Sequence, residues 1–328
     1  MTGVELSLAK AINAGLRRAL ESDPHVMLMG EDIGSLGGVF RVTDGLSKDF
    51  GEHRVMDTPL AESGIVGSAV GLALRGYRPV CEIQFDGFVY PAFDQIVSQV
   101  AKLRFRSSGR LPMPIVIRIP YGGGIGAVEH HSESPETYFV HTPGLRVVSP
   151  STPVDGYWMV QQAIASDDPV VFLEPKRRYW DKGAVDVDAD RAPHSLYASR
   201  VLREGTEAVL LGYGPTVRTC LDAAEAAAED GHSLGVIDLR SLSPVDWVTV
   251  VNAARRVGRV VVVHEAHRTL GLGAEIAARL TEECFYALES PVLRVTGYDT
   301  PYPPSRIEDS WLPDVDRVLD AVDEALAF

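Results

Sequence analysis

The stretch that decides the fold is "PIVIRIPYGGGIGAVEHHSESPE", residues 114–136. Its first seven residues, Pro114 to Pro120, predict a fully buried strand because nearly all of them are apolar. Four glycines, a glutamate and two adjacent histidines come next, and the polar run after them is typical of a helix start. Open α/β sheets bind their ligands in such segments, at the C-terminal ends of core strands.

The same alternation of strand and helix patterns extends over residues 1 to about 175. Strands are predicted at "VMLMG" (26–30) and "PVCEIQF" (79–85), and helices at residues 61–76 and 90–105. Strands that are apolar on both faces and alternate with helices indicate a parallel sheet covered by helices. The fold class is therefore α/β.

A change of pattern divides the chain. The charged stretch "KRRYWDKGAVDVDADRAPHS" loses the periodicity, and a second, shorter alternation of strands and helices follows it. We expect an α/β module over residues 1–180, a linker over residues 181–199 and a smaller α/β domain over residues 200–328.

Composition limits the class of protein. The chain has 328 residues, 45% of them hydrophobic and 23% charged, and a formal net charge of -14. This balance argues against nucleic acid and anionic membranes as partners and fits either simple solubility or a basic partner. Cys81, Cys220 and Cys284 show neither zinc spacing nor a disulfide framework. With no signal-peptide or membrane-length segment, the expected location is the cytoplasm.

The glycines resemble a dinucleotide-binding fingerprint only superficially. Gly122, Gly124 and Ala127 have the required spacing, but the following residues are too polar to form a helix that packs on a sheet. "GYGPTV", from Gly212, places Val217 where a third glycine belongs, and neither match is followed by an acid for a ribose. We therefore reject NAD as a cofactor.

The two histidines do not predict a metal site. His130 and His131 are adjacent, and with Glu129 and Glu133 they lack the i, i+4 spacing that places two imidazoles on one helical face. Adjacent histidines on a loop are expected to point apart, so at most one of them serves a given site. The position of the loop favours one functional and one structural histidine.

Glu62 opens a helix that is otherwise built of small and aliphatic residues. An acid in a first helical turn is ordinary on a surface helix. Here the helix has almost no polar face, which predicts burial and a raised pKa for the carboxyl. A carboxyl in that state suits a shared proton with a basic ring nitrogen, although a plain N-terminal charge remains the alternative.

Aromatic residues crowd the following strand-to-helix turn. They are Phe85, Phe88, Tyr90 and Phe93. Such residues either complete a core or form a stacking wall for a flat heterocycle, and the sequence favours neither.

Several motifs together resemble one family. They are "GEDIG" (30–34), "GGVFRVTDGL" (37–46), "DTPLAESGIVGSAVGLALRGYRPVCEIQF" (57–85), "PAFDQIVSQVAKLRFRSSG" (91–109), "HHSESPETYFVHTPGLRVVSPSTP" (130–153) and "DDPVVFLEPKRRYW" (167–180). The chain closely resembles, from end to end, the β subunit of thiamine-diphosphate-dependent 2-oxo acid dehydrogenases. The implied fold is a pyrimidine-binding module followed by a transketolase-type C-terminal domain.

The resemblance assigns roles to individual residues. Glu62 would hydrogen-bond the aminopyrimidine ring of thiamine diphosphate, Phe88 would stack on that ring, and Gln84 would line its pocket. His131 would assist transfer of the acyl unit to a lipoyl group. Asp168 is the candidate for a monovalent cation such as K⁺, which family members often bind.

Partners are implied as well. The chain lacks the Gly-Asp-Gly motif with a downstream Asn that holds Mg²⁺ and the diphosphate, so a separate α chain should supply both in a tetramer of two α and two β subunits. The terminal carboxylate of Phe328 would contact the lipoyl-bearing acyltransferase core.

The substrate is the least determined property. "HHSESPE" and "EPKRRYW" resemble the branched-chain type, which favours 2-oxoisovalerate over pyruvate. Two other readings compete: a self-sufficient thiamine transferase of the transketolase kind, which would need a diphosphate module absent here, and a non-catalytic scaffold subunit, which would leave Glu62 without a role.

Overall fold

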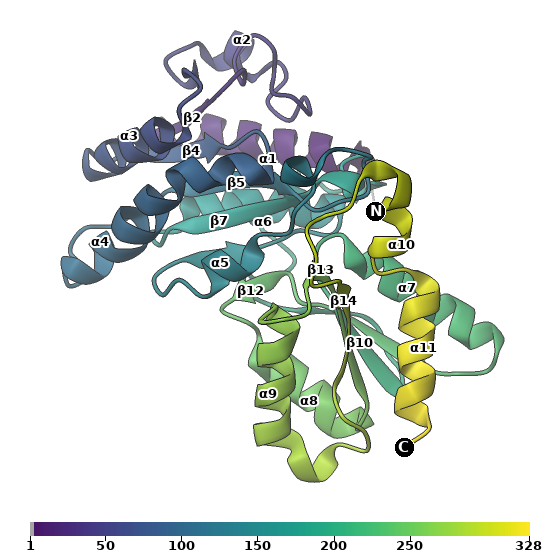
Figure 1. The fold of residues 1–328 in the computed structure, drawn as a ribbon. Helices are drawn as coiled ribbons and strands as arrows, with labels where there is room; N and C mark the ends of the chain where they lie inside the picture. The colour runs from purple at the N-terminus through teal and green to yellow at the C-terminus, as the bar shows by residue number, and fades with distance from the viewer. Residues whose placement is uncertain (1–2) are drawn as a thin grey trace. The chain divides into compact units, whose positions relative to one another are not determined.

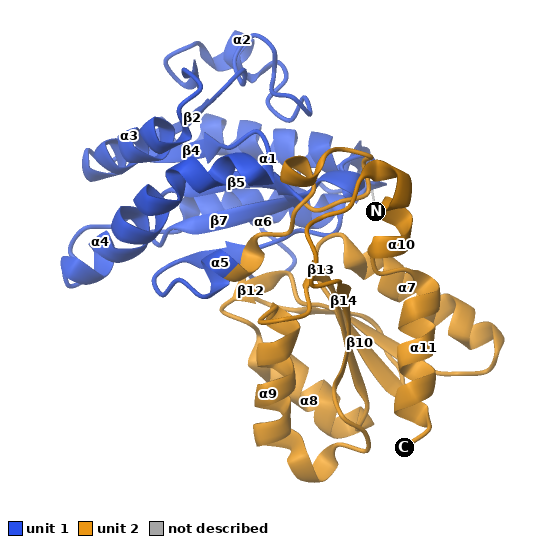
Figure 2. Ribbon diagram, in the orientation of Figure 1, with its two compact units in different colours: residues 1–121, 138–196 blue, residues 122–137, 197–328 orange. Residues whose placement is uncertain are grey.

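The computed structural model describes residues 3–328 and divides them into two compact units (Figure 1, Figure 2). Unit 1 comprises the described residues up to Tyr121 and residues 138–196. Unit 2 comprises residues 122–137 and 197–328. The glycine-rich segment that follows the decisive strand is therefore part of unit 2, although it is flanked in sequence by unit 1.

A parallel sheet forms the centre of unit 1, with strand order β6-β7-β5-β4-β2-β3. The strands are β2 (Val26–Gly30), β3 (Val55–Asp57), β4 (Arg78–Glu82), β5 (Val116–Tyr121), β6 (Arg146–Val148) and β7 (Val170–Pro175). Strands β2, β5 and β7 are buried along their whole length, as expected where helices cover both faces of a parallel sheet.

The helices of unit 1 include α1 (Leu8–Ser22), α2 (Leu46–Phe50), α3 (Glu62–Leu74), α4 (Ala101–Arg106) and α6 (Pro153–Ala165). Of these, α1, α3 and α6 pack on strands β2, β4 and β7. Helix α1 buries residues spaced three and four apart, and the hydroxyl of Ser7 caps it by accepting from the amide of Lys10 at 3.3 Å. Helix α3 confirms the helix predicted at residues 61–76.

The helix predicted at residues 90–105 is less regular than expected. A 3₁₀ segment, η1 (Asp86–Ala92), is followed by a π-helical segment, η2 (Gln95–Val100), and only then by α4. Pro91 lies inside η1 and has no amide hydrogen to donate to a regular helical ladder.

The stretch expected to be a linker contains a strand. Residues Lys182–Val185 form β8, which pairs antiparallel with β1 (Val4–Ser7), and Val4 faces Val185. Unit 1 accordingly extends to Leu196.

Unit 2 has its own five-stranded sheet, in the order β14-β13-β10-β11-β9, with β9 antiparallel to β11. Its elements are η3 (Glu129–His131), β9 (Arg200–Arg203), β10 (Ala208–Gly212), α7 (Thr216–Glu229), β11 (Leu234–Asp238), β12 (Ser241–Ser243), α8 (Trp247–Val257), β13 (Val260–His267), α9 (Leu272–Cys284), η5 (Phe285–Ala287), β14 (Leu293–Gly297), η6 (Ser305–Ile307), α10 (Glu308–Trp311) and α11 (Val315–Leu326).

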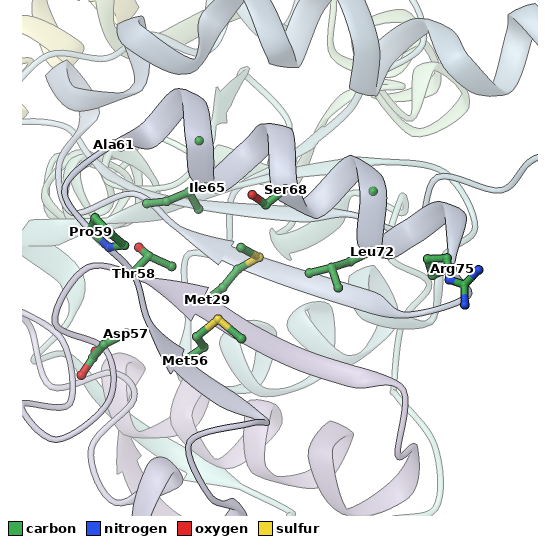
Figure 3. Close-up of a pocket in the computed structure, with 12 residues that line it drawn as sticks. Met29, Met56, Asp57, Thr58, Pro59, Ala61, Ile65, Ser68, Leu72 and Arg75 are labelled. Atoms are coloured by element: carbon green, nitrogen blue, oxygen red, sulfur yellow. The ribbon is translucent and has the colours of Figure 1, made fainter.

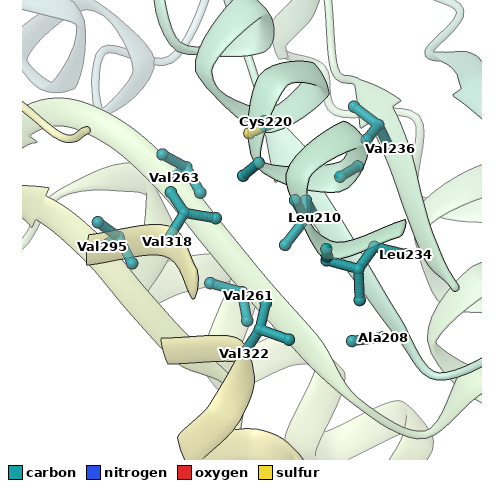
Figure 4. Close-up of a cluster of buried hydrophobic side chains, with 13 residues drawn as sticks. Ala208, Leu210, Cys220, Leu234, Val236, Val261, Val263, Val295, Val318 and Val322 are labelled. Atoms are coloured by element: carbon teal, nitrogen blue, oxygen red, sulfur yellow. The ribbon is translucent and has the colours of Figure 1, made fainter. Parts of the chain in front are cut away.

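One core of unit 2 lies between this sheet and two helices. Side chains of α7 and α11, including Cys220 and Val322, pack against Leu210, Val261 and others on the strands (Figure 4). Helices α8 and α9 cover the opposite face of the sheet (Figure 1). The second alternation of strands and helices read from the sequence is therefore an α/β domain.

Cys81, Cys220 and Cys284 are buried and form no disulfide. Among residues 3–328 no helix combines the length and apolarity needed to cross a bilayer.

Candidate functional site

Glu62 is the first residue of α3 and directly follows the loop after β3. Its relative exposure is 8%, which confirms the predicted burial. Ala61, at the N-cap position, offers no side-chain cap. Within residues 3–328 the carboxylate of Glu62 accepts no hydrogen bond and forms no ion pair. A buried carboxylate in this state is suited to accept a hydrogen bond from a bound molecule.

Glu62 belongs to a small group of acids that sequence reasoning missed. Burial, and then the neighbouring charges of Asp32 and Glu62, raise the pKa of Glu31, which directly follows β2. Asp32 has a positive φ of 57° and accepts a hydrogen bond from Nε2 of Gln84 at 3.3 Å. The structure therefore brings Gln84 into the same group as Glu62. A pair of acids directly after a fully buried strand was the available signal in the sequence.

Phe88 lies in η1, at the turn that follows β4. Its ring meets Phe85 edge to face at a centroid distance of 5.9 Å, and Phe85 meets Phe40 in the same way at 5.4 Å. Phe40 in turn lies 5.0 Å from the ring of Tyr179. Phe88 is partly exposed and belongs to this aromatic row, which gives a flat ligand a surface to stack on.

A buried ion pair fixes the turn that carries Phe88. Asp86 and Lys176 are fully buried and bonded to each other through Oδ1 and Nζ. The Lys176 ammonium also lies 5.5 Å from the centroid of the Phe85 ring. Because Asp86 follows β4 and Lys176 follows β7, the pair ties two strand ends together beside the aromatic row.

A second buried network joins three adjacent strands. Arg118 of β5 donates to Glu82 of β4 at 2.5 Å and, through two nitrogens, to Glu174 of β7 at 2.6 and 3.0 Å. The hydroxyl of Tyr179 also donates to Glu174 at 2.6 Å. Burial raises the pKa of Glu82 and would by itself lower that of Arg118, but Glu174 and Glu82 raise the Arg118 pKa above its ordinary value. The guanidinium is therefore always charged.

A cavity of about 650 Å³ lies between α3 and strands β2 and β3 (Figure 3). It is mostly apolar: Met29 and Met56 line it from the strands, and Ile65 and Leu72 line it from the helix. The cavity begins beside Ala61, but Glu62 does not line it. It is therefore distinct from the group of acids around Glu62.

The histidines lie in η3, within unit 2. Their ring centroids are 4.3 Å apart in an edge-to-face contact, so the expectation that adjacent histidines point apart is wrong here. His130 is exposed and His131 is partly buried. Nδ1 of His131 lies 3.0 Å from the carbonyl oxygen of His130, which leaves Nε2 on the far side of the ring.

Glu136, at the end of the glycine-rich segment, opens the short helix α5 (Glu136–Val140) and is fully buried. The hydroxyl of Tyr213 donates to its Oε1 at 2.6 Å. Burial raises the pKa of Glu136 to about 8, and the charge of Glu265 adds to the rise. The carboxyl is therefore protonated at neutral pH.

We expect Glu136→Gln to flatten the pH dependence of stability. Between the ordinary pKa of 4.5 and about pH 8, the unfolded chain releases a proton that the folded chain retains, so the wild type loses stability as the pH rises. The amide keeps the acceptor for Tyr213 and does not titrate. Melting temperatures of both proteins at pH 5 and pH 8 check this: the variant should lose several degrees less than the wild type, and equal losses would contradict it.

The last two candidate residues, Asp168 and Phe328, have different surroundings. The carboxylate of Asp168 accepts from Arg146 at 3.0 Å and forms an ion pair with Arg104 at 3.1 Å. Two guanidinium groups at one carboxylate disfavour a cation there. Phe328 lies beyond the end of α11 and is 67% exposed.

No group of three or more His, Cys, Asp or Glu side chains among residues 3–328 has the geometry of a metal site. The buried Glu62, Gln84 and the partly exposed Phe88 all belong to unit 1.

Family comparisons agree with this class of fold. Residues 4–181 match the transketolase pyrimidine-binding domain family, and residues 198–318 match the transketolase C-terminal domain family. A split-gene transketolase solved as an inactive β4 tetramer has the same fold, with a TM-score of 0.81 at 22% identity over 98% of both chains.

Curated relatives define the family more closely. The pyruvate dehydrogenase E1 component subunit beta of Leifsonia xyli is 58% identical over 98% of this chain and 95% of its own length. The 3-methyl-2-oxobutanoate dehydrogenase subunit beta of Mycobacterium tuberculosis is 55% identical over 98% of this chain and 92% of its own. The chain belongs to the β subunits of 2-oxo acid dehydrogenase E1 components, as its sequence motifs predict.

Proposed function

We propose that the chain, together with an α subunit, oxidatively decarboxylates branched-chain 2-oxo acids of the 2-oxoisovalerate type and transfers the acyl unit to the lipoyl group of an acyltransferase core. Pyruvate is the alternative substrate, because relatives named for either acid are similar to the chain at 58% and 55% identity. The observation that carries the proposal is the buried Glu62 carboxylate, which accepts no hydrogen bond within residues 3–328.

The residues of unit 1 fit the flat part of thiamine diphosphate. When bound, this cofactor supplies a nucleophilic carbon and an electron sink for the loss of CO₂ from a 2-oxo acid. Glu62 would hydrogen-bond a nitrogen of the pyrimidine ring, because its carboxylate is buried at the start of α3 and accepts no hydrogen bond within residues 3–328. Phe88 would stack on the ring, and Gln84, held by Asp32, would line its edge. His131 would assist acyl transfer to the lipoyl group.

Partners complete the proposed enzyme. Mg²⁺ and the diphosphate would be held by the α subunit, because this chain has no Gly-Asp-Gly motif, and the assembly would be a heterotetramer of two α and two β chains. The terminal carboxylate of the exposed Phe328 would contact the acyltransferase core, and the net charge of -14 suits a basic docking partner. Because Arg104 and Arg146 already pair with Asp168, backbone carbonyl oxygens would supply the ligands of a K⁺ ion. The proposed location is the cytoplasm, as expected from the sequence.

The test is co-expression with an α subunit and assay on both acids. We expect the chain alone to turn over neither acid, because half of the cofactor site is missing, and the assembled pair to prefer 2-oxoisovalerate. Turnover by the purified chain alone would contradict the shared site. A pair active only on pyruvate would support the proposed enzyme class but show that pyruvate, not 2-oxoisovalerate, is the substrate. A pair inactive on both acids would favour the scaffold alternative.

A further inference from the structure

The glycine-rich segment is bound by two buried carboxylates of unit 2. The amide of Gly123 donates to Oε2 of Glu265 at 3.0 Å. The amides of Gly124 and Gly126 donate to the two oxygens of Glu308 at 2.8 and 2.9 Å. Glu265 and Glu308 are 2% and 5% exposed, so these hydrogen bonds to charged acceptors are shielded from water.

The close approach of the backbone to these carboxylates requires glycine at positions 122 and 123. Gly122 has a φ of +83°, and a Cβ there would lie 2.7 Å from Oε2 of Glu265. A Cβ on Gly123 would overlap the hydroxyl of Tyr302, which itself donates to Glu308 at 2.5 Å. The run of glycines read from the sequence therefore allows the backbone to reach the carboxylates, not a phosphate.

Both carboxylates stand on well-packed parts of unit 2. Glu265 lies near the end of β13, an interior strand of the sheet. Glu308 opens α10, and the ring of Trp311 in the same helix packs on Tyr302 at a centroid distance of 4.9 Å. The anchor points are therefore more deeply buried than the exposed residues 128–130 of the same loop.

Short backbone bonds connect the anchored glycines to the histidines. The amide of Gly122 donates to the carbonyl of Glu133 at 2.9 Å, which closes the segment into a loop. Within the loop, the amide of His131 donates to Val128 at 3.0 Å and that of Ser132 to Glu129 at 2.9 Å. The position of the His131 backbone therefore depends on where the glycines are held.

We propose that Glu265 and Glu308 are positioning residues for acyl transfer: they hold the loop 122–133 so that His131 stands where the lipoyl group arrives. The proposal rests on the role assigned to His131 under the proposed function. Neither carboxylate touches reacting atoms; both act through the loop backbone.

Glu308→Gln in the assembled α/β pair tests this. An amide keeps one acceptor oxygen but turns an NH₂ group toward a glycine amide, so one anchoring bond is lost. We expect hydrogen exchange of a peptide covering 122–136 to be about tenfold faster. Acylation of a lipoyl domain should slow by about 10- to 100-fold, whereas decarboxylation measured with ferricyanide as electron acceptor should change less than about twofold.

Three further variants complete the design. His131→Ala should slow lipoyl acylation, and adding Glu308→Gln to it should slow the reaction little further, because both act through one group. Glu265→Gln repeats the test should Glu308→Gln fail to fold. Asp246→Asn is the matched control: Asp246 also accepts from two backbone amides of unit 2, those of Thr249 and Ser199, and its loss should leave both reactions unchanged.

The outcomes separate the two proposals. Equal slowing of both reactions by the Glu308 variant, or wild-type exchange of the loop, would overturn the positioning role. Unchanged lipoyl acylation in His131→Ala would instead overturn the assignment of His131, and with it the purpose of the anchors, whatever the exchange data show about the anchoring itself.

Discussion

Replacing Glu62 with Gln is expected to lower the turnover of the assembled α/β enzyme by roughly 10²- to 10⁴-fold, the range typical of a lost acid–base group. The amide has nearly the same size and shape, so packing at the start of α3 should be preserved. It cannot hold a proton on demand, however. Since Glu62 is 8% exposed and accepts no hydrogen bond from residues 3–328, its carboxylate is available to a bound molecule.

Three measurements check this expectation: turnover on 2-oxoisovalerate and pyruvate, the melting temperature, and the affinity for thiamine diphosphate by calorimetry. Glu52→Gln is the matched control, because Glu52 is an exposed acid of the same unit and its loss should leave all three unchanged. Wild-type turnover in Glu62→Gln would mean that the carboxyl has no catalytic role, and the scaffold alternative would then be favoured.

Replacing Arg118 with Met is expected to lower the free energy of unfolding by about 3–5 kcal/mol, since the two buried carboxyl groups of the network lose the guanidinium that pairs with them. Glu82 and Glu174 would be left facing each other at 6% and 0% exposure. The damage should extend to the aromatic row, because Tyr179 bonds to Glu174 and packs on Phe40.

Chemical denaturation of Arg118→Met beside two comparison variants measures this effect. Arg17→Met removes a more exposed ion pair, Arg17–Asp49 at 2.7 Å, and should cost at most about 1 kcal/mol. Adding Glu82→Gln and Glu174→Gln to Arg118→Met should recover part of the loss, because no buried charge is left unpaired. A cost for Arg118→Met no larger than that for Arg17→Met would show that the network contributes little to stability.

Local sequence patterns were enough to predict the main elements of the fold. "PIVIRIP" and "VMLMG" form buried parallel strands, β5 and β2, because their apolar runs satisfy a sheet covered on both faces. The burial of Glu62 was also readable, since its helix offers no polar face. These features depend on neighbouring residues, which the sequence displays directly.

Features that depend on distant residues were not predictable in this way. Arg118 sits in the middle of an apolar strand, and its partners lie 36 and 56 positions away. The carboxylates that hold the glycine-rich loop lie 142 and 184 positions along the chain from the amides that donate hydrogen bonds to them. In the same way, the charged stretch after β7 conceals β8, because its partner strand is at the other end of unit 1.

The membership of residues 122–137 in unit 2 has a practical consequence for hybrid proteins. A chimera that joins one relative up to about residue 197 to another relative beyond it would take the glycines and the acids that bind them from different proteins. A chimera that keeps unit 2 intact needs three junctions, because residues 122–137 and 197–328 then have to come from the same relative.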